Sequence, residues 1–167
     1  MKTLYLCRHA KSSWADPGMD DFERPLNDRG LRNAPHMART FKERGEPVDL
    51  IVSSPAKRAL TTAQFFASEL GLPPDRFRQD KSIYNAERSA LMHLVQNLPD
   101  SAHRVMLFGH NPGFTELVDH LCDVGVGNMP TCGMVRVDLP VETWNEISRE
   151  LGNLVWFDHP KRHPGQE

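Results

Sequence analysis

Short apolar runs alternate with longer amphipathic segments along this chain of 167 residues. The short runs are nearly continuous in apolar residues, which is typical of strands buried on both faces, whereas the longer segments carry apolar residues at helical spacing. The short runs predict three buried strands, at residues 3–8, 49–52 and 104–108. The longer segments predict four helices, at residues 30–44, 56–70, 87–98 and about 114–122.

The helix predicted at residues 30–44 contains a proline, Pro35. A proline in a helix interior removes a hydrogen bond and clashes with the preceding turn, whereas the first turn accepts it. We therefore expect the helix to begin near Asn33, and Gly45 and Pro47 to end it. Its apolar positions at near-helical spacing are Leu31, Ala34, Ala38 and Phe41.

Strands that alternate with helices predict an α/β fold of three layers, in which a mainly parallel central sheet has helices on both faces. Residues 133–139 and 151–157 predict a late antiparallel pair of strands, and residues 76–83 are expected to be extended. Neither a repeat nor a low-complexity linker divides the chain. We therefore expect one domain over residues 1–158, followed by a polar C-terminal tail over residues 159–167.

Charge and composition argue against several classes of function. The formal net charge is -2, from 20 basic and 22 acidic residues, so we expect neither nucleic acid nor an anionic membrane surface as a partner. No apolar run approaches the roughly 18 residues of a membrane-spanning helix, and the N-terminus lacks the pattern of a signal peptide. Cys7, Cys122 and Cys132 lack the spacing of a metal site, which favours reduced thiols and a cytoplasmic location.

Basic and histidine side chains follow three of the predicted strands, at the point where each strand ends. The first strand ends at Arg8 and His9, and the third is followed by His110. The second ends in residues 53–55, and the helix after it carries Arg58 in its first turn. Ligands of open α/β sheets bind beyond the carboxyl ends of the strands, so these side chains are expected to converge at one edge.

Two arginines and two imidazoles at one edge would suit a dianionic phosphoryl group. Guanidinium groups offer forked donors that match phosphate oxygens, and the start of the helix near residue 56 adds backbone N–H groups. An imidazole nitrogen can also attack phosphorus and form a covalent intermediate. Each residue alone has an ordinary structural explanation, but their coincidence at three strand ends favours an anion site.

The assembled motifs resemble those of the histidine phosphatase superfamily. Its Arg-His-Gly motif corresponds to Arg8-His9-Ala10, with alanine in place of the usual glycine. Its Ser-Ser-Pro-x-x-Arg-Ala motif corresponds to residues 53–59, and its third motif corresponds to residues 109–113. The Arg-Pro-Leu segment at residues 24–26, followed by Arg29-Gly30, resembles the SixA-type phosphohistidine phosphatases.

This resemblance implies a phosphoglycerate mutase-like fold and a role for each residue of the site. His9 would be the nucleophile that becomes transiently phosphorylated, and Arg8 and Arg58 would hold the phosphoryl oxygens. His110 would donate to those oxygens and stabilise the transition state. The resemblance implies neither a metal nor an organic cofactor, because arginines neutralise the charge that magnesium neutralises elsewhere.

The sequence departs from the family pattern after the nucleophile. Many members have an asparagine six residues after it, where this chain has Ala15. Ser12 or Ser13 could supply a phosphate contact instead, although an ordinary loop serine is an equal alternative. Arg24 could reach the site as a further substrate contact, or else be a surface arginine.

A second departure concerns the proton donor. Many members carry a glutamate where this chain has Asn85, and an amide cannot act as the acid. Glu87 is a candidate acid, although a carboxylate is favoured at a helix start in any case; Asp20 and Asp21 are weaker candidates. An alkyl phosphate benefits strongly from a proton donor, whereas the nitrogen of phosphohistidine leaves more easily. The missing glutamate therefore favours N–P substrates or activated esters.

Two classes of function remain open from the sequence. The first is a cofactor-independent phosphatase that works through phosphorylated His9, with a phosphorylated protein or a small phosphorylated molecule as its substrate. A SixA-like phosphohistidine phosphatase is the favoured form, and a small-molecule phosphomonoesterase is an alternative. The second is a module that binds a phosphoryl ligand without useful turnover. The sequence does not indicate an oligomeric state.

Overall fold

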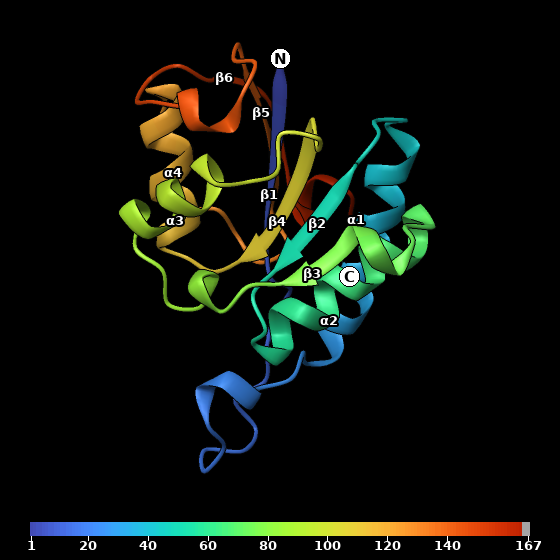
Figure 1. Cartoon of the computed structure of the whole chain (residues 1–167). Helices are drawn as coiled ribbons and strands as arrows, with labels where there is room; N and C mark the ends of the chain where they lie inside the picture. The colour runs from blue at the N-terminus through green and yellow to red at the C-terminus, as the bar shows by residue number, and fades with distance from the viewer. Residues whose placement is uncertain (165–167) are drawn as a thin grey trace.

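The computed structural model describes residues 1–164 and contains a six-stranded sheet between layers of helices (Figure 1). No helix in this part of the chain is both long and apolar enough to span a membrane. The strands are β1 (Lys2–Arg8), β2 (Leu50–Ser53), β3 (Phe77–Gln79), β4 (Arg104–Gly109), β5 (Met134–Leu139) and β6 (Asn153–Asp158). The α-helices are α1 (Asp28–Glu43), α2 (Lys57–Leu70), α3 (Arg88–Gln96) and α4 (Gly113–Cys122). Short 3₁₀ helices in the connections are η1 (Asp21–Glu23), η2 (Pro74–Arg76), η3 (Lys81–Ile83), η4 (Trp144–Glu146) and η5 (Pro160–Arg162).

The sheet has the strand order β3-β2-β4-β1-β5-β6. The first four of these strands are parallel, whereas β5 is antiparallel to β1 and β6 is antiparallel to β5. The predicted α/β sheet with a late antiparallel pair is therefore confirmed, although only Phe77–Gln79 of the predicted extended segment 76–83 form a strand and Lys81–Ile83 form η3. Since β4 lies between β1 and β2, the three strands that end in the candidate residues are direct neighbours.

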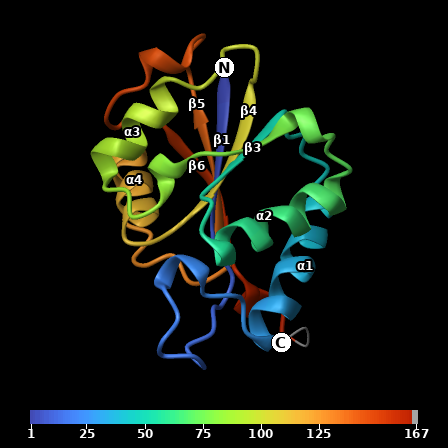
Figure 2. The same cartoon turned by 60° about the horizontal axis from the view of Figure 1, so that its bottom comes forward.

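Each face of the sheet carries its own apolar core. Along β1, Leu4 and Leu6 pack toward α3 and α4, whereas Tyr5 and Cys7 pack toward α1 and α2. All four side chains are fully buried. Figure 2 shows the two helix pairs on opposite sides of the sheet, which confirms the predicted three layers. Cys7 therefore belongs to the core, as the alternation of side chains along a strand predicts.

The start of the first helix differs from the prediction. α1 begins at Asp28 rather than near Asn33, because the side chain of Asn27 caps it. The Asn27 carboxamide oxygen accepts a hydrogen bond from the backbone N–H of Gly30 at 2.9 Å. Pro35 consequently lies inside the helix and not in its first turn.

The buried face of α1 also differs from the prediction at one position. Leu31 is 47% exposed, whereas Met37 is fully buried. Gly30, Ala34, Met37 and Phe41 follow the spacing of three and four residues that places side chains on one helix face. Leu31 lies in the first turn of α1, and its side chain is half-exposed there.

The chain after β6 stays in contact with the domain as far as it is described. Asp158 accepts a hydrogen bond from Nη2 of Arg44 at 2.9 Å and lies 2.9 Å from Nε2 of His163. Pro160 of η5 is buried. Residues 165–167 of the predicted tail lie outside the described residues, and the division into domain and tail stays a prediction.

Gly30 allows α1 to lie directly against the loop that follows β1. A Cβ atom at this position would overlap the carbonyl oxygen of Lys11. The backbone N–H of Asn27 donates to that same carbonyl at 3.0 Å, and the N–H of Ser13 donates to Pro25 at 2.8 Å. The Arg-Pro-Leu and Gly elements of the sequence therefore hold the loop that leaves the candidate site.

We expect Gly30→Ala to lower the free energy of unfolding by about 1–3 kcal/mol, because the added methyl group forces apart two tightly packed backbones. Urea unfolding monitored by circular dichroism measures the change. Gly125→Ala is the matched control, since no atom lies within 4 Å of a Cβ at that position. Equal effects of the two substitutions would contradict the close approach.

Candidate active site

Backbone hydrogen bonds tie together the ends of β1, β2 and β4. The N–H of His9 donates to the carbonyl oxygen of Gly109 at 3.0 Å, and the N–H of Ser54 donates to that of Phe108 at 2.9 Å. The residues that follow these strands are therefore held side by side. The expected convergence of the three strand ends is confirmed, and it includes the His110 that follows Gly109.

A threonine of α2 ties that helix to the turn after β1. Oγ1 of Thr62 accepts a hydrogen bond from the N–H of Ala10 at 3.0 Å and donates to the carbonyl oxygen of Arg58 at 2.8 Å. Thr62 is fully buried. These bonds position the first turn of α2, and with it Arg58, next to His9.

His9 is buried and has a defined tautomer. Its Nδ1 lies 2.7 Å from the carbonyl oxygen of Ala10, which can only accept, so Nδ1 carries the proton and Nε2 has the free lone pair. Burial lowers the pKa of His9 to about 3, although the bond to Ala10 opposes the shift. The charges of His110, Arg58 and Arg8 also lower it. A neutral imidazole with a free Nε2 is the nucleophilic form.

The ring of His110 lies beside that of His9, with 5.3 Å between the ring centroids. Its Nε2 lies 2.8 Å from Oγ of Ser54, which already accepts from the N–H of Ala56 at 3.2 Å. This arrangement favours donation of the serine proton to Nε2 and leaves the ring proton on Nδ1. Burial, followed by the charge of Arg58, lowers the pKa of His110 to about 4, so this ring is also neutral at pH 7.

Arg8 and His110 each hold a buried nitrogen without a hydrogen-bond partner among residues 1–164. These atoms are Nε of Arg8 and Nδ1 of His110, while Nη1 of Arg8 donates to the carbonyl oxygen of Met129 at 2.8 Å. Buried donors without partners are rare because each costs about 1–3 kcal/mol. Two of them near His9 indicate a site that can donate hydrogen bonds to the oxygen atoms of a ligand.

Arg58 is paired with Asp21, which the sequence indicated only as a weak candidate acid. Nη2 of Arg58 donates to Oδ2 of Asp21 at 2.9 Å, and the hydroxyl of Tyr84 donates to the same oxygen at 2.7 Å. Burial raises the pKa of the Asp21 carboxyl, but the hydrogen bonds from Tyr84 and Arg58 lower it overall. Asp21 is therefore ionised at neutral pH and poorly suited to donate a proton.

Tyr84 was not indicated by the sequence reasoning. Its ring packs against that of His110 at 5.6 Å between centroids, and its hydroxyl reaches Asp21. The sequence signal that could have found it is its position directly before Asn85, where the family places its acid. Ser54, the partner of His110, lay within a recognised motif but was given no role of its own.

Arg24 is buried and lies next to Arg58, so the alternative of a surface arginine is wrong. Its Nε donates to the carbonyl oxygen of Ser13 at 3.2 Å, and its Nη2 donates to Oγ of Ser12. Its guanidinium carbon lies 3.4 Å from the centroid of the Trp14 ring. Ser12 therefore holds Arg24 in place; whether Ser12 also contacts a substrate stays a prediction.

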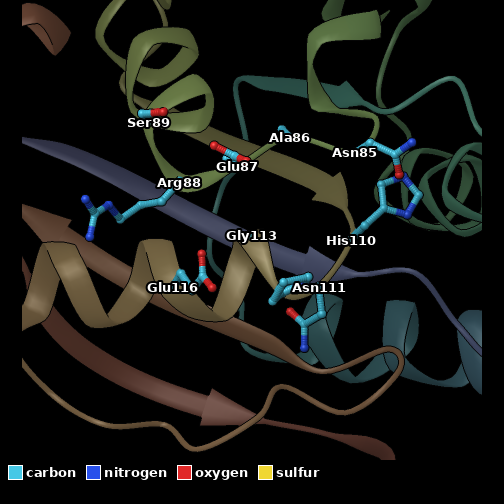
Figure 3. Close-up of a pocket in the computed structure, with 10 residues that line it drawn as sticks. Asn85, Ala86, Glu87, Arg88, Ser89, His110, Asn111, Gly113 and Glu116 are labelled. Atoms are coloured by element: carbon cyan, nitrogen blue, oxygen red, sulfur yellow. The ribbon is translucent and has the colours of Figure 1, made fainter.

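A pocket of about 470 Å³ opens beside His110, between the starts of α3 and α4. Figure 3 shows that Asn85, Glu87 and Glu116 line it together with His110. In this view the carboxylate of Glu87 is separated from the ring of His110. The pocket offers space for the leaving group of a phosphorylated substrate. The role of Glu87 as an acid stays a prediction.

Gly113 lets α4 approach the wall of this pocket. A Cβ atom on Gly113, the first residue of α4, would overlap the carbonyl oxygen of Ala86. The glycine that ends the third sequence motif therefore holds the segment at residues 84–87 beside His110.

Guanidinium groups supply the positive charge of the site. Among residues 1–164, no group of three or more His, Cys, Asp or Glu side chains is arranged to hold a metal ion. The forked donors of Arg8, Arg24 and Arg58 suit the oxygens of a phosphoryl group. With His9 within reach of the charges of Arg8 and Arg58, and its Nε2 free, the arrangement can bind a phosphoryl group and accept it covalently.

Three comparisons relate the chain to known proteins. Residues 4–79 match the sequence profile of the histidine phosphatase superfamily (branch 1). A protein of Agrobacterium tumefaciens assigned as the phosphohistidine phosphatase SixA is 28% identical, with a TM-score of 0.79 over 95% of this chain and 98% of that chain. The protein histidine phosphatase SixA, solved with tungstate, shares the fold with a TM-score of 0.82 at 21% identity, over 96% and 98% of the two chains. An uncharacterised chloroplastic protein of Arabidopsis thaliana is 28% identical over 93% of this chain and 74% of its own length.

The lowered pKa of His9 predicts a loss of stability in acid. Below about pH 6.5 the unfolded chain binds a proton on this histidine that the folded chain does not, so the free energy of unfolding falls as the pH falls. Between pH 7 and pH 5, the wild type should lose about 2 kcal/mol more than His9→Asn. Urea unfolding at both pH values measures this difference.

The exposed His93 provides the control for this comparison. His93→Asn should retain the wild-type dependence on pH. If His9→Asn lost as much stability as the wild type between pH 7 and pH 5, the buried neutral state of His9 would be wrong.

Proposed function

We propose that the substrate of this protein is phosphohistidine and that His9 carries the phosphoryl group in a covalent intermediate. The proposal starts from the finding that this chain belongs to the histidine phosphatase superfamily and is a phosphatase. The observation that carries the proposal is the hydrogen bond from Nδ1 of His9 to the carbonyl oxygen of Ala10, which leaves Nε2 free on a ring within reach of the charges of Arg8 and Arg58. The similarity to a protein assigned as SixA supports phosphohistidine as the substrate.

In the first step, Nε2 of His9 attacks phosphorus and the bond from phosphorus to the substrate nitrogen breaks. The electron pair of that bond goes to the leaving nitrogen, which departs as a neutral imidazole when the other nitrogen of the substrate ring is protonated. Arg8 and Arg58 hold the phosphoryl oxygens during the transfer. The phosphorylated ring of His9 is cationic, and the carbonyl oxygen of Ala10 stabilises it through the N–H of Nδ1.

In the second step, water attacks the phosphorus of phosphorylated His9. The bond from phosphorus to Nε2 breaks, the electron pair returns to the ring, and inorganic phosphate leaves. A ring N–H of His110 donates to the phosphoryl oxygens in both steps, which stabilises the charge that develops in the transition state. The balance of the two steps is hydrolysis of one N–P bond by one water molecule.

The residues beside the leaving group favour an N–P bond over an alkyl ester. Asn85 lies in the pocket beside His110 and cannot act as an acid, and Asp21 is held ionised by its partners. A phosphohistidine takes its proton from solvent before the bond breaks and needs no such donor. A small phosphate ester is the alternative substrate, because a pocket of about 470 Å³ lies within the range of small-molecule sites.

We further propose that the protein works in a reducing compartment such as the cytoplasm. Cys7, Cys122 and Cys132 are all free thiols in the structure. Free buried thiols persist where the surroundings keep them reduced.

We expect His9→Ala to lower turnover of a phosphohistidine protein by about 10³-fold or more, because no other group replaces the nucleophile. Rapid quench of the wild type should trap a phosphoenzyme that is labile in acid and stable in alkali, and the variant should form none. His93→Ala is the matched control and should retain both the wild-type turnover and the formation of the phosphoenzyme. Wild-type turnover by His9→Ala would contradict the mechanism, and binding without hydrolysis by the wild type would support a binding module instead.

We also expect the enzyme to prefer phosphohistidine protein to alkyl phosphates, with aryl phosphates between them, because only the alkyl leaving group requires a strong proton donor. The comparison of kcat/KM across these three substrates measures the preference. Glu87→Gln should change phosphohistidine turnover less than twofold, as should Glu116→Gln, which alters the same pocket. Strong alkyl phosphate turnover that Glu87→Gln alone abolished would instead identify Glu87 as the acid.

A further inference from the structure

One carboxylate lies among the arginines of the site. Nη1 of Arg58 donates to the backbone carbonyl oxygen of Asp21 at 2.6 Å, and Nη2 donates to its Oδ2 at 2.9 Å. Nη1 of Arg24 donates to Oδ1 of the same carboxylate at 3.2 Å. The side chains of Arg24 and Arg58 are only 7% and 8% exposed, whereas that of Asp21 is 47% exposed. Asp21 therefore lies between two buried cations and solvent.

This carboxylate changes the charge that an incoming anion meets. Burial, followed by the charge of Arg58, lowers the pKa of both Arg8 and Arg24, so the guanidinium group of Arg58 lies within reach of the charges of the other two. The three arginines contribute three positive charges, and the two neutral histidines contribute none. Asp21 lowers the sum to two, which balances the charge of a phosphoryl dianion.

Asp21 also occupies hydrogen-bond donors that a phosphoryl group would use. Both terminal nitrogens of Arg58 already donate to Asp21. A phosphoryl group bound at Arg58 must use the remaining N–H groups or replace the carboxylate. The half-exposed carboxylate of Asp21 can leave Arg58 and become hydrated at a small cost in free energy, because ion pairs open to solvent are weak.

We propose that Asp21 is a specificity-determining residue that competes with phosphate for Arg58 and so keeps the affinity for inorganic phosphate low. The inference rests on the proposed function, because it takes inorganic phosphate to be the product. A substrate keeps the contacts of its leaving group in the pocket beside His110, whereas free phosphate is held by the charged groups alone. The carboxylate of Asp21 therefore leaves free phosphate weakly bound, whereas a substrate has the contacts of its leaving group in addition.

Two other roles for Asp21 give different results. If Asp21 served only to position Arg58, its removal would weaken phosphate binding. If it were the proton donor, its removal would lower kcat for alkyl phosphates and leave phosphate binding unchanged. The sign of the change in phosphate affinity therefore separates the three roles.

The experiment measures the Kd of the full chain for inorganic phosphate by isothermal titration calorimetry at pH 7. Asp21→Asn keeps the shape of the side chain and removes its charge, and we expect it to bind phosphate about three- to tenfold more tightly, as loss of one nearby like charge predicts. The gain should shrink at high salt, because salt screens charges that are partly open to solvent. The inhibition constant of phosphate against phosphohistidine turnover should fall by the same factor.

Two further variants control for charge and for folding. Glu23→Gln removes the same charge from an exposed residue of η1 and should change the Kd less than twofold. Asp21→Glu keeps the charge and should retain the wild-type Kd within about threefold. Thermal unfolding of each variant reports whether the fold is kept. A Kd of Asp21→Asn that is unchanged or weaker than that of the wild type would overturn the inference.

Arg58→Ala separates failure of the inference from failure of the proposed site. If this variant bound phosphate as well as the wild type, phosphate would not bind at Arg58, and both the site and the inference would be wrong. If Arg58→Ala lost phosphate binding while Asp21→Asn bound no more tightly, the site would stand and only the role of Asp21 would be wrong. If neither the wild type nor Asp21→Asn bound phosphate at millimolar concentration, the inference would be wrong, while phosphohistidine turnover would still test the proposed function.

Discussion

The hydrogen bonds that join the carboxyl ends of β1, β4 and β2 are the constraint on which the site depends. The bond from the N–H of His9 to Gly109 sets the position of the first histidine relative to the second, and the bond from Ser54 to Phe108 adds the end of β2. These bonds follow from the parallel register of the sheet, which is buried on both faces and cannot slip without exposing its core. The proposed nucleophile, His9, is therefore held by the same interactions that hold the fold together.

The electrostatics of the site follow from burial of that edge. The two histidines stay neutral because burial and the nearby guanidinium groups both disfavour the imidazolium form. The arginines stay charged and gather at the same edge, and Arg24 and Arg58 share the carboxylate of Asp21. A site with neutral nucleophile and surplus positive charge is complementary to an anion that carries an electrophilic phosphorus. This complementarity is the physical basis of the phosphoryl transfer that we propose.

The fold could be read from the sequence wherever the pattern was local and strong. The buried strands and the helices α2 to α4 came from apolar periodicity alone, within a few residues of their observed ends. The start of α1 was misplaced because the cost of Pro35 was weighed without the cap that Asn27 provides. Leu31 was expected on the buried face but is half-exposed, since burial of a helix position depends on the distant residues that pack against it.

The sequence by itself determined which groups the proposed chemistry can use, because Arg8, His9, Arg58 and His110 each lie at or after the end of a strand that periodicity identifies. It could not determine what surrounds them, because contacts between distant segments depend on the packing of loops. Only the tertiary structure placed Asp21 on Arg58, buried Arg24 against Trp14 and set Tyr84 beside His110. Only the structure also decided that both histidines are neutral, since a pKa is set by burial and by neighbours that lie far apart in the chain.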